Sequence, residues 1–182
     1  MQTLDLKFDD GGVQVKEGLV TGYASLFGVT DQGNDKVMPG AYTKSLAKAD
    51  TQKRKIKMLW QHNPSEPIGV WDEVKEDGKG LLVKGRLLTE VAKGREAIAL
   101  VEAGAMDGLS IGYQTRKASK GKDGSRELTD LDLWEVSLVT FPMQLEAGIS
   151  DIKAMDSPVE KKRFLENHLR DAGFSVKEGK YG

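Results

Sequence analysis

Three residue types that together can cleave peptide or ester bonds lie in three separate segments of this chain. His62 ends an apolar stretch in "MLWQHNP", Ser110 lies between glycines in "DGLSIGY", and Glu135 lies within the apolar run "LWEVSLVTF". A serine hydroxyl becomes a strong nucleophile only when a neighbouring base accepts its proton. Histidine is the usual base, and a buried carboxylate holds its ring in the required tautomer. These residue types are therefore compatible with a serine hydrolase.

Each of these residues also has a purely structural interpretation. His62 can end a strand with a local hydrogen bond, and Ser110 can be a small residue where two backbones pack closely. Glu135 is harder to explain, because a buried carboxylate normally has a partner. Alternation along residues 130–138 nevertheless places Glu135 on the same strand face as Leu131, and that face can be partly solvated. The order His-Ser-acid is not specific by itself.

Other catalytic chemistries have few candidate residues in this sequence. The chain has no cysteine, which excludes a thiol nucleophile, a disulfide framework and a Cys-ligated zinc site. Its second histidine, His168, lies in a charged segment, where we expect it to be solvated. Two histidines so far apart in the sequence make a weak case for a metal site. We therefore expect no metal and no cofactor.

Composition and charge favour a single soluble domain with a highly charged surface. The chain has 182 residues, of which 38% are hydrophobic and 30% are charged. Lys and Arg number 27 against 28 Asp and Glu, so the net charge of -1 shows no overall basic excess for nucleic acid. We see no secretory signal in "MQTLDLKFDD" and no apolar run of the ~20 residues that a membrane span needs.

The pattern of apolar residues and turn signals predicts many short strands with two or three helices. We expect a bulged strand in "LVTGYASLFGV", a strand that ends at His62 before Asn63-Pro64, and a hairpin around "EDGKG". Strands are also expected in "LSIGYQTRKA" and "TDLDLWEVSLVTF". A short helix is expected in "AYTKSLAKAD", and a longer one begins after Thr89 as N-cap and ends at Gly104. The fold class is therefore mainly β with surrounding helices (α+β), as a barrel or a sandwich.

The composition changes near Met155. The segment "SPVEKKRFLENHLRDAGF" predicts a charged helix, with Ser157 as N-cap, Pro158 in the first turn and Gly173 as the stop. We therefore expect a β domain over residues 1–154 and a charged C-terminal helix or tail over residues 155–182.

Four blocks of this sequence, in the same order, resemble one known family. They are "GYASLFGVTDQGNDKVMPGAYTKSL", "MLWQHNPSEPIGVWDEVKEDGKGLLVKGRL", "DGLSIGYQTRKA" and "LWEVSLVTFPMQLEA". Together they are similar to the HK97-type prohead proteases, the capsid maturation proteases of tailed bacteriophages, over about residues 18 to 150. The resemblance implies a β-barrel surrounded by helices, as in the related herpesvirus capsid maturation proteases.

The same resemblance implies roles for individual residues. Ser110 is the implied nucleophile and His62 the implied general base. Herpesvirus enzymes use a second histidine as the third member, and here Glu135 lies at the equivalent place, with Asp130 and Asp132 as alternatives.

Similarity to the herpesvirus arrangement also implies that the loop around Met143 and Gln144 supplies backbone N–H groups for the oxyanion hole. This chain departs from the family pattern in that loop. In "FPMQLEA", the Pro, Glu and Ala match the family, whereas Met143, Gln144 and Leu145 do not.

The implied function is cleavage, by a serine endopeptidase, of a scaffold protein or of the scaffolding segment of the major capsid protein. Such enzymes are packaged inside the immature procapsid in the host cytoplasm and often cleave themselves. The herpesvirus relatives imply a homodimer. The charged tail fits a segment that targets the enzyme to the shell or is removed, and it equally fits an ordinary surface helix.

Two alternative functions come from other classes of protein. The first is a non-catalytic capsid assembly or scaffolding protein with the same fold, although the presence of His62, Ser110 and Glu135 argues against it. The second is a nucleic-acid-binding β-barrel, which the local basic segment "TRKASKGKDGSR" supports but the aromatic content of 7% and the net charge do not. We expect neither nucleic acid nor membrane as a partner.

Overall fold

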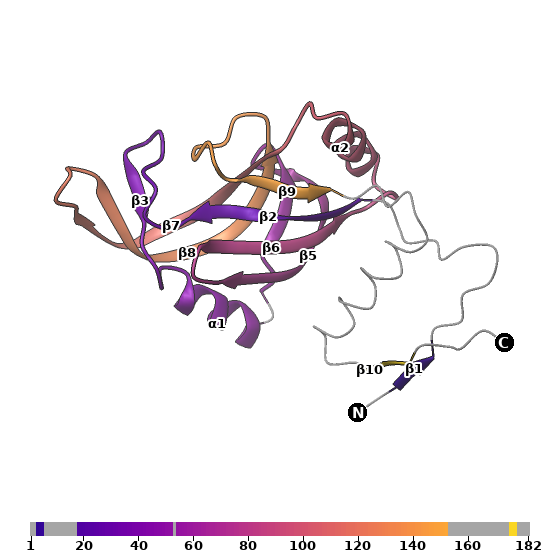
Figure 1. Cartoon of the computed structure of the whole chain (residues 1–182), viewed down its shortest axis with the longest axis horizontal. Coiled ribbons are helices and arrows are strands. Elements are labelled where there is room, and N and C mark those ends of the chain that lie inside the picture. Colours follow the sequence, from indigo (N-terminus) through magenta and orange to yellow (C-terminus); the bar gives the residue numbers. More distant parts are fainter. Residues whose placement is uncertain (1–2, 6–17, 53, 153–174, 178–182) are drawn as a thin grey trace. The chain divides into compact units, whose positions relative to one another are not determined.

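The computed structural model describes residues 3–5, 18–52, 54–152 and 175–177, and these contain ten strands and two helices (Figure 1). The chain divides into a unit of residues 17–152 and a second unit of residues 1–16 and 153–182. The strands are β1 (Thr3–Asp5), β2 (Leu19–Leu26), β3 (Asp35–Val37), β4 (Lys57–Trp60), β5 (Asn63–Glu76), β6 (Gly80–Leu87), β7 (Gly108–Lys120), β8 (Arg126–Val139), β9 (Gly148–Ile152) and β10 (Ser175–Lys177), and the helices are α1 (Thr43–Thr51) and α2 (Ala92–Glu102).

The larger unit is a seven-stranded barrel with one additional strand. Hydrogen bonds join the strands in the order β8-β4-β5-β6-β2-β9-β7, and pairing of β7 with β8 closes the circle. Strand β3 pairs in parallel with the N-terminal end of β8. Helix α1 packs against β8 and β5, and α2 packs against β5 and β6. The prediction of a mainly β barrel with surrounding helices is confirmed (Figure 1).

The apolar residues that alternate along the strands fill this barrel. The fully buried side chains include Leu109 of β7 and Leu131, Leu133, Val136 and Leu138 of β8. The predicted bulge in the first long strand is confirmed, because the register of β2 against β6 shifts between Tyr23 and Ser25.

Helix α2 begins later than the sequence predicts. The prediction of Thr89 as N-cap is wrong, because the N-cap residue is Val91 and it makes no side-chain cap hydrogen bond. The N–H of Val91 instead donates to the carbonyl of Leu88 in a turn that continues from β6, and this turn delays the helix start. The predicted stop at Gly104 is confirmed by its left-handed φ of 71°.

The second unit is described only at its two short strands. Strands β1 and β10 pair in parallel, with Thr3 opposite Ser175 and Asp5 opposite Lys177. The predicted helix in the C-terminal segment and His168 lie outside the described residues. The division into a domain of residues 1–154 and a tail of residues 155–182 remains a prediction.

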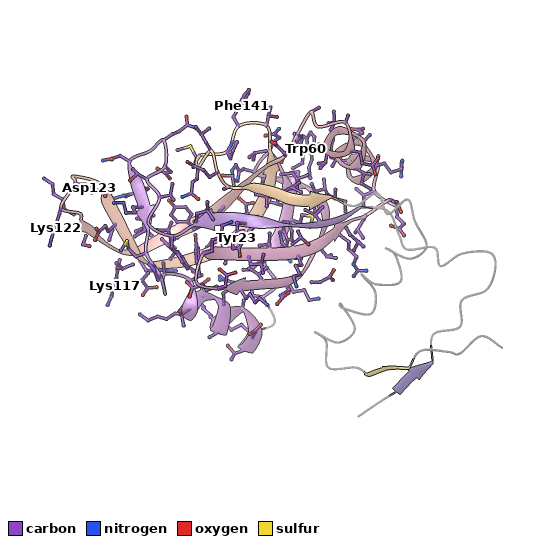
Figure 2. All side chains as sticks on the ribbon, in the orientation of Figure 1. Tyr23, Trp60, Lys117, Lys122, Asp123 and Phe141 are labelled. Atoms are coloured by element: carbon purple, nitrogen blue, oxygen red, sulfur yellow. The ribbon has the colours of Figure 1, made fainter. Side chains whose placement is uncertain are left out.

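The lysines of the basic segment and an exposed apolar side chain lie on different elements of the barrel unit (Figure 2). Lys117 and Lys122 lie on the β7–β8 hairpin, whereas Phe141, with 87% of its surface exposed, lies on the loop between β8 and β9. The two arginines of the basic segment, Arg116 and Arg126, each form an ion pair with an aspartate. Within the described ranges, no helix is long and apolar enough to cross a membrane.

Candidate active site

His62 occupies a two-residue turn between β4 and β5. Trp60 pairs with Asn63 across this turn, and both central residues, Gln61 and His62, have left-handed φ values of 50° and 59°. Such φ values characterise the tight hairpin turns whose twist matches that of the strands, and they are unusual for residues other than glycine. The N–H of Gln61 donates to the carbonyl of Leu138, so β8 holds the turn in place (2.9 Å).

The prediction that this strand ends at His62, stopped by Asn63-Pro64, is wrong, because β4 ends at Trp60. Strand β5 begins at Asn63, directly after the turn. A proline near the start of a strand is tolerated because it removes only one ladder donor at the end of the pairing. As a result, His62 is fixed from both sides by paired strands.

A bulge in β8 determines where the side chain of Glu135 points. Leu133 pairs with Tyr113 of β7 and Glu135 pairs with Gly112, so Trp134 has no partner on β7. One additional residue reverses the strand's alternation, as bulges do. Leu133 and Val136 consequently both face the core. The expectation that Glu135 shares a face with Leu131 is therefore wrong.

Gly112 makes room for the Glu135 side chain. A Cβ atom at this position would lie 2.0 Å from Oε1 and 2.7 Å from Cδ of Glu135. Any larger residue would therefore displace the carboxylate. The glycine after the serine in "GLSIGY" thus has a packing role that involves the candidate acid directly.

Glu135 and His62 are in direct contact. Oε1 of Glu135 lies 2.5 Å from Nδ1 of His62, and the Glu135 side chain is 11% exposed whereas that of His62 is 42% exposed. The hydrogen bond to Glu135 is the main cause that raises the pKa of His62 above its ordinary value of 6.5, against a lowering effect of burial. The contact leaves Nε2 of the ring for another partner.

Ser137 joins the same two residues and was not singled out as a site residue from the sequence. Its hydroxyl donates to Oε2 of Glu135 at 2.6 Å and accepts the backbone N–H of His62 at 3.1 Å. The side chain is fully buried. Its position two residues after Glu135, on the same strand face, was the signal available in the sequence.

Ser110 lies on the strand beside this pair. It is directly opposite Ser137 in the β7–β8 ladder, so their side chains are on the same face of the sheet. Its neighbours Leu109 and Ile111 pair with core residues of β8. Ser110 is 6% exposed, and within the described residues its hydroxyl forms no hydrogen bond, including none with His62. The hydroxyl therefore lies next to the Glu135–Ser137–His62 network without a partner in it.

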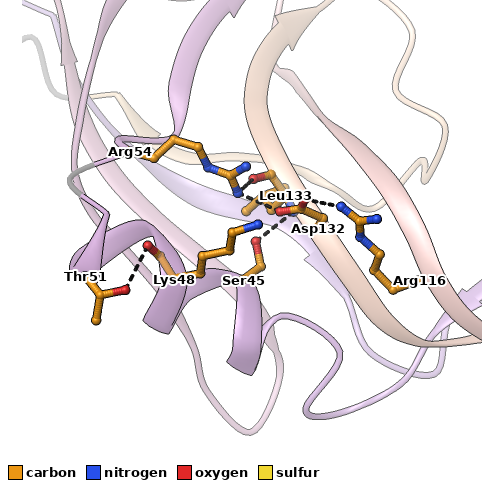
Figure 3. A network of polar contacts seen from close by, with 7 residues as sticks. All are labelled: Ser45, Lys48, Thr51, Arg54, Arg116, Asp132 and Leu133. Atoms are coloured by element: carbon orange, nitrogen blue, oxygen red, sulfur yellow. Dashed lines mark hydrogen bonds and ion pairs between the residues drawn. The ribbon is translucent and has the colours of Figure 1, made fainter.

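The other candidate acids are engaged elsewhere (Figure 3). Asp132 accepts hydrogen bonds from Arg54 at 2.6 Å and from Arg116 at 2.8 Å, and these cations lower its pKa to about 2. Asp130 forms an ion pair with Lys44. Among the three candidate acids, Glu135 is the one in contact with His62.

The predicted oxyanion residues lie beside Ser110. Met143, Gln144 and Ser110 line one pocket of about 100 Å³. Two hydrogen bonds to the backbone of Leu26 fix the Gln144 side-chain amide. Its Oε1 accepts the N–H of Leu26 at 2.6 Å, and its Nε2 donates to the carbonyl of Leu26 at 3.0 Å. Within the described part of the chain, the backbone N–H groups of Met143 and Gln144 donate no hydrogen bond, so they are available to a ligand.

This arrangement contains the elements of acyl-transfer chemistry. A histidine with an oriented ring, a neighbouring serine and free backbone donors are the parts that such reactions use. No group of three or more His, Asp or Glu side chains that could hold a metal ion occurs in the ranges that the structure describes.

Comparisons with known proteins identify relatives of this chain. Residues 2–162 match the family described as Caudovirus prohead serine protease. The prohead protease of Enterobacteria phage HK97 is 36% identical over 171 residues, which are 92% of this chain and 73% of that protein. The capsid polyprotein of Pseudomonas phage PAJU2 is 36% identical over 109 residues, which are 56% of this chain but only 16% of that protein.

Solved structures show that the fold is shared more widely. The bacteriophage T4 capsid assembly protease superimposes with a TM-score of 0.58 at 14% identity, over 74% of this chain and 92% of that chain. The varicella-zoster virus protease gives a TM-score of 0.46 at 14% identity, over 88% of this chain and 81% of that chain. The likeness to the T4 enzyme shows a common fold.

Proposed function

This chain belongs to the Caudovirus prohead serine protease family and is a capsid maturation protease, and we propose that Ser110, His62 and Glu135 form its catalytic triad. The observation that carries the proposal is the 2.5 Å contact between Glu135 Oε1 and His62 Nδ1, beside an unpartnered serine on the adjacent strand. Neither Ser110 nor His62 belongs to the apolar core cluster of the described residues.

The proposed reaction proceeds through an acyl-enzyme. Ser110 Oγ attacks the carbonyl carbon of the scissile bond while Nε2 of His62 accepts the hydroxyl proton. Glu135 accepts the Nδ1–H hydrogen bond, which keeps Nε2 unprotonated before the attack and stabilises the imidazolium afterwards. His62 then donates its proton to the leaving amine, and a water molecule releases the acyl group by the same steps.

The negative charge of the tetrahedral intermediate needs hydrogen-bond donors. We propose the backbone N–H groups of Met143 and Gln144, because both residues line the Ser110 pocket and neither N–H has an acceptor in the described part of the chain. The Gln144 side chain, bonded to Leu26 and Val29, holds this part of the loop against β2 and the residues after it. A donor lost from such a site typically lowers the rate by about 10² to 10³.

We propose that the substrates are a scaffold protein, or the scaffolding segment of the major capsid protein, and the protease itself. The names of the relatives support this choice, since one is a capsid assembly protease and another a capsid polyprotein. The proposed site of action is the procapsid in the host cytoplasm, with the enzyme as a homodimer. The proposed tail of residues 155–182 targets the enzyme to the shell or is removed.

Co-expression with the major capsid or scaffold protein from the same genome tests the catalytic residue. Intact masses are compared for the wild type, Ser110→Ala and the control Ser119→Ala, which changes an exposed serine of the same strand. We expect shortened products with the wild type and the control, and full-length chains with Ser110→Ala.

Two other results would contradict the proposal. Identical products with and without Ser110 would assign the cleavage to another residue or enzyme. If no variant cleaves but the chain still enters capsids, a non-catalytic assembly function would replace it.

A further inference from the structure

The pocket beside Ser110 is lined by both apolar and acidic side chains. The apolar side chains that line it come from three strands and one loop: Ala24, Val29, Val37, Leu109 and Ile111. Its polar lining includes Asp31 and Asp35. The volume of about 100 Å³ corresponds to roughly three water molecules, which is enough for several heavy atoms of one side chain. Because Ser110 lines the same pocket, its occupant lies next to the bond that Ser110 attacks.

One of the two carboxylates in this pocket is already compensated. Asp35 is 9% exposed and accepts two hydrogen bonds from the Arg126 guanidinium, at 2.7 Å from Nε and 2.5 Å from Nη2. The Tyr113 hydroxyl also approaches Asp35, at 3.4 Å. A bidentate pair of this kind leaves little unsatisfied charge for a ligand.

Asp31 is different, because within the described residues it forms no ion pair, and the nearby Arg126 guanidinium makes its hydrogen bonds to Asp35 instead. Its Oδ1 atom accepts the backbone N–H groups of Gly33 and Asp35, at 2.8 and 2.9 Å. These bonds fix the carboxylate in the loop, while Oδ2 forms no hydrogen bond with the described part of the chain. The N–H of the next residue, Gln32, donates to the carbonyl of Met143 in the β8–β9 loop at 2.9 Å. This bond fixes the backbone next to Asp31 and so holds Asp31 in place in the pocket.

We propose that Asp31 selects substrates with a lysine or arginine side chain on the residue whose carbonyl Ser110 attacks. The aliphatic stem of such a side chain packs along the apolar side chains of the pocket, and its cationic end reaches the free Oδ2 of Asp31. A neutral side chain of the same length makes the same apolar contacts but leaves the partly buried carboxylate without an ion-pair partner. An acidic side chain meets a like charge. The proposal names the substrate class of the site proposed above and rests on Ser110 being the nucleophile.

A peptide series tests this preference on the wild-type enzyme. The peptides are identical except at the selected residue, which is lysine, norleucine, alanine or glutamate. We expect kcat/KM to be on the order of tenfold to a hundredfold higher for lysine than for norleucine, because a charged hydrogen bond is lost with norleucine. Glutamate is expected to be the poorest substrate. Equal rates for lysine and norleucine would overturn the proposal without any variant.

Asp31→Asn removes the charge and keeps the Oδ1 acceptor for the loop. It should lower kcat/KM for the lysine peptide to the norleucine value and leave the norleucine value unchanged. Asp50→Asn, at an exposed position of α1, is the matched control and should change neither. A loss of rate on all peptides alike would contradict a role in selection.

Peptide-binding measurements test the role of Asp31 independently of the role of Ser110 as nucleophile. The lysine peptide should bind Ser110→Ala more tightly than the norleucine peptide, and the difference should vanish in Ser110→Ala with Asp31→Asn. If Ser110→Ala still cleaves peptides, the catalytic assignment fails, whereas the binding difference still decides the role of Asp31. If both peptides bind equally, the selection by Asp31 is overturned and the triad is untouched.

Discussion

The contact between the Glu135 carboxylate and Nδ1 of His62 determines the direction of the pH dependence. The hydrogen bond to Glu135 raises the pKa of His62 above 6.5 and therefore favours the protonated ring. A protonated ring cannot accept the proton of Ser110, so activity requires the neutral form.

The stability of the folded chain has the opposite dependence on pH. The contribution of this pair to folding is complete below the unfolded pKa and is lost as the pH rises through the folded pKa.

Glu135→Gln is expected to change both the rate and the pH profile. In the wild type, kcat/KM should increase with pH with an apparent pKa above 6.5. Glutamine removes the charge that raises this pKa, so the midpoint should move to lower pH, and the plateau rate should fall by up to about 10⁴-fold as tautomer control is lost. Peptide cleavage measured from pH 5 to 9 checks this. An unchanged midpoint in the variant would show that Glu135 does not set the protonation of His62.

The residue types of the proposed triad could be predicted from the sequence, but their supports could not. Histidine, serine and glutamate are recognisable because few side chains perform this chemistry. Ser137 bridges Glu135 and the backbone of His62, and this role appears only when the β4–β5 turn lies beside β8. Gly112 leaves space for the Glu135 side chain, and this role appears only when β7 and β8 are paired. A serine and a glycine in a strand are too common to be identified without knowledge of these neighbours.

At the level of the elements, the β8 bulge is what directs Glu135 toward His62. The backbone of Leu133, next to the bulge, is satisfied from outside the β7 ladder. Its N–H donates to Ser45 of α1 at 2.8 Å, and its carbonyl accepts from Arg54 at 3.3 Å (Figure 3). The Arg54 guanidinium also lies 4.3 Å from the ring centroid of Trp134, the bulged residue. Helix α1 and the residues after it therefore stabilise the bulge.

Ser45→Ala tests this support. Ser45 is 3% exposed, so the substitution leaves the N–H of Leu133 buried without its partner, at a cost of about 1 to 3 kcal/mol. We expect a lower free energy of unfolding in urea and also a lower kcat, because the bulge positions Glu135. Thr51→Ala, an exposed position of the same helix whose hydroxyl bonds only the helix backbone, is the control. A stability loss with an unchanged kcat would separate the bulge from catalysis.

The bulge also explains why the strand face that carries Glu135 could not be predicted from the sequence. Simple alternation describes each half of β8 correctly. Leu131 and Leu133, before the bulge in the sequence, face the core, and so do Val136 and Leu138 after it. At Trp134 the alternation of inward-facing and outward-facing side chains shifts by one residue, and this shift depends on which residues of β7 and α1 lie opposite Trp134. Strands, helices and hairpins could therefore be predicted from local patterns, whereas the face that carries Glu135 could not.

At the level of the whole molecule, the barrel closes around a core that belongs to one unit. Among the described residues, the buried apolar cluster runs from Val20 to Leu138 and lies within residues 17–152, as do all proposed active-site residues. Strands β7 and β9 pair at a single register position, Gly108 with Gly148, whereas β7 and β8, whose pairing closes the barrel, pair along most of their length. The order of strands in this circle joins segments far apart in the chain, and local sequence patterns carry no information about it.

A chain of residues 17–152 is therefore expected to fold and to cleave peptides. Because the apolar cluster of the described residues lies wholly within 17–152, the Tm should stay within a few degrees of the full-length value, where 1 kcal/mol corresponds to roughly 2–4 °C at this size. Calorimetry and peptide kcat/KM measure both properties on the two chains. A large drop in Tm or activity would show that residues outside 17–152 complete the domain. If peptide cleavage is retained but co-expressed capsid protein is no longer cut, the removed segments act in recruitment to the shell, since the catalytic groups are then intact.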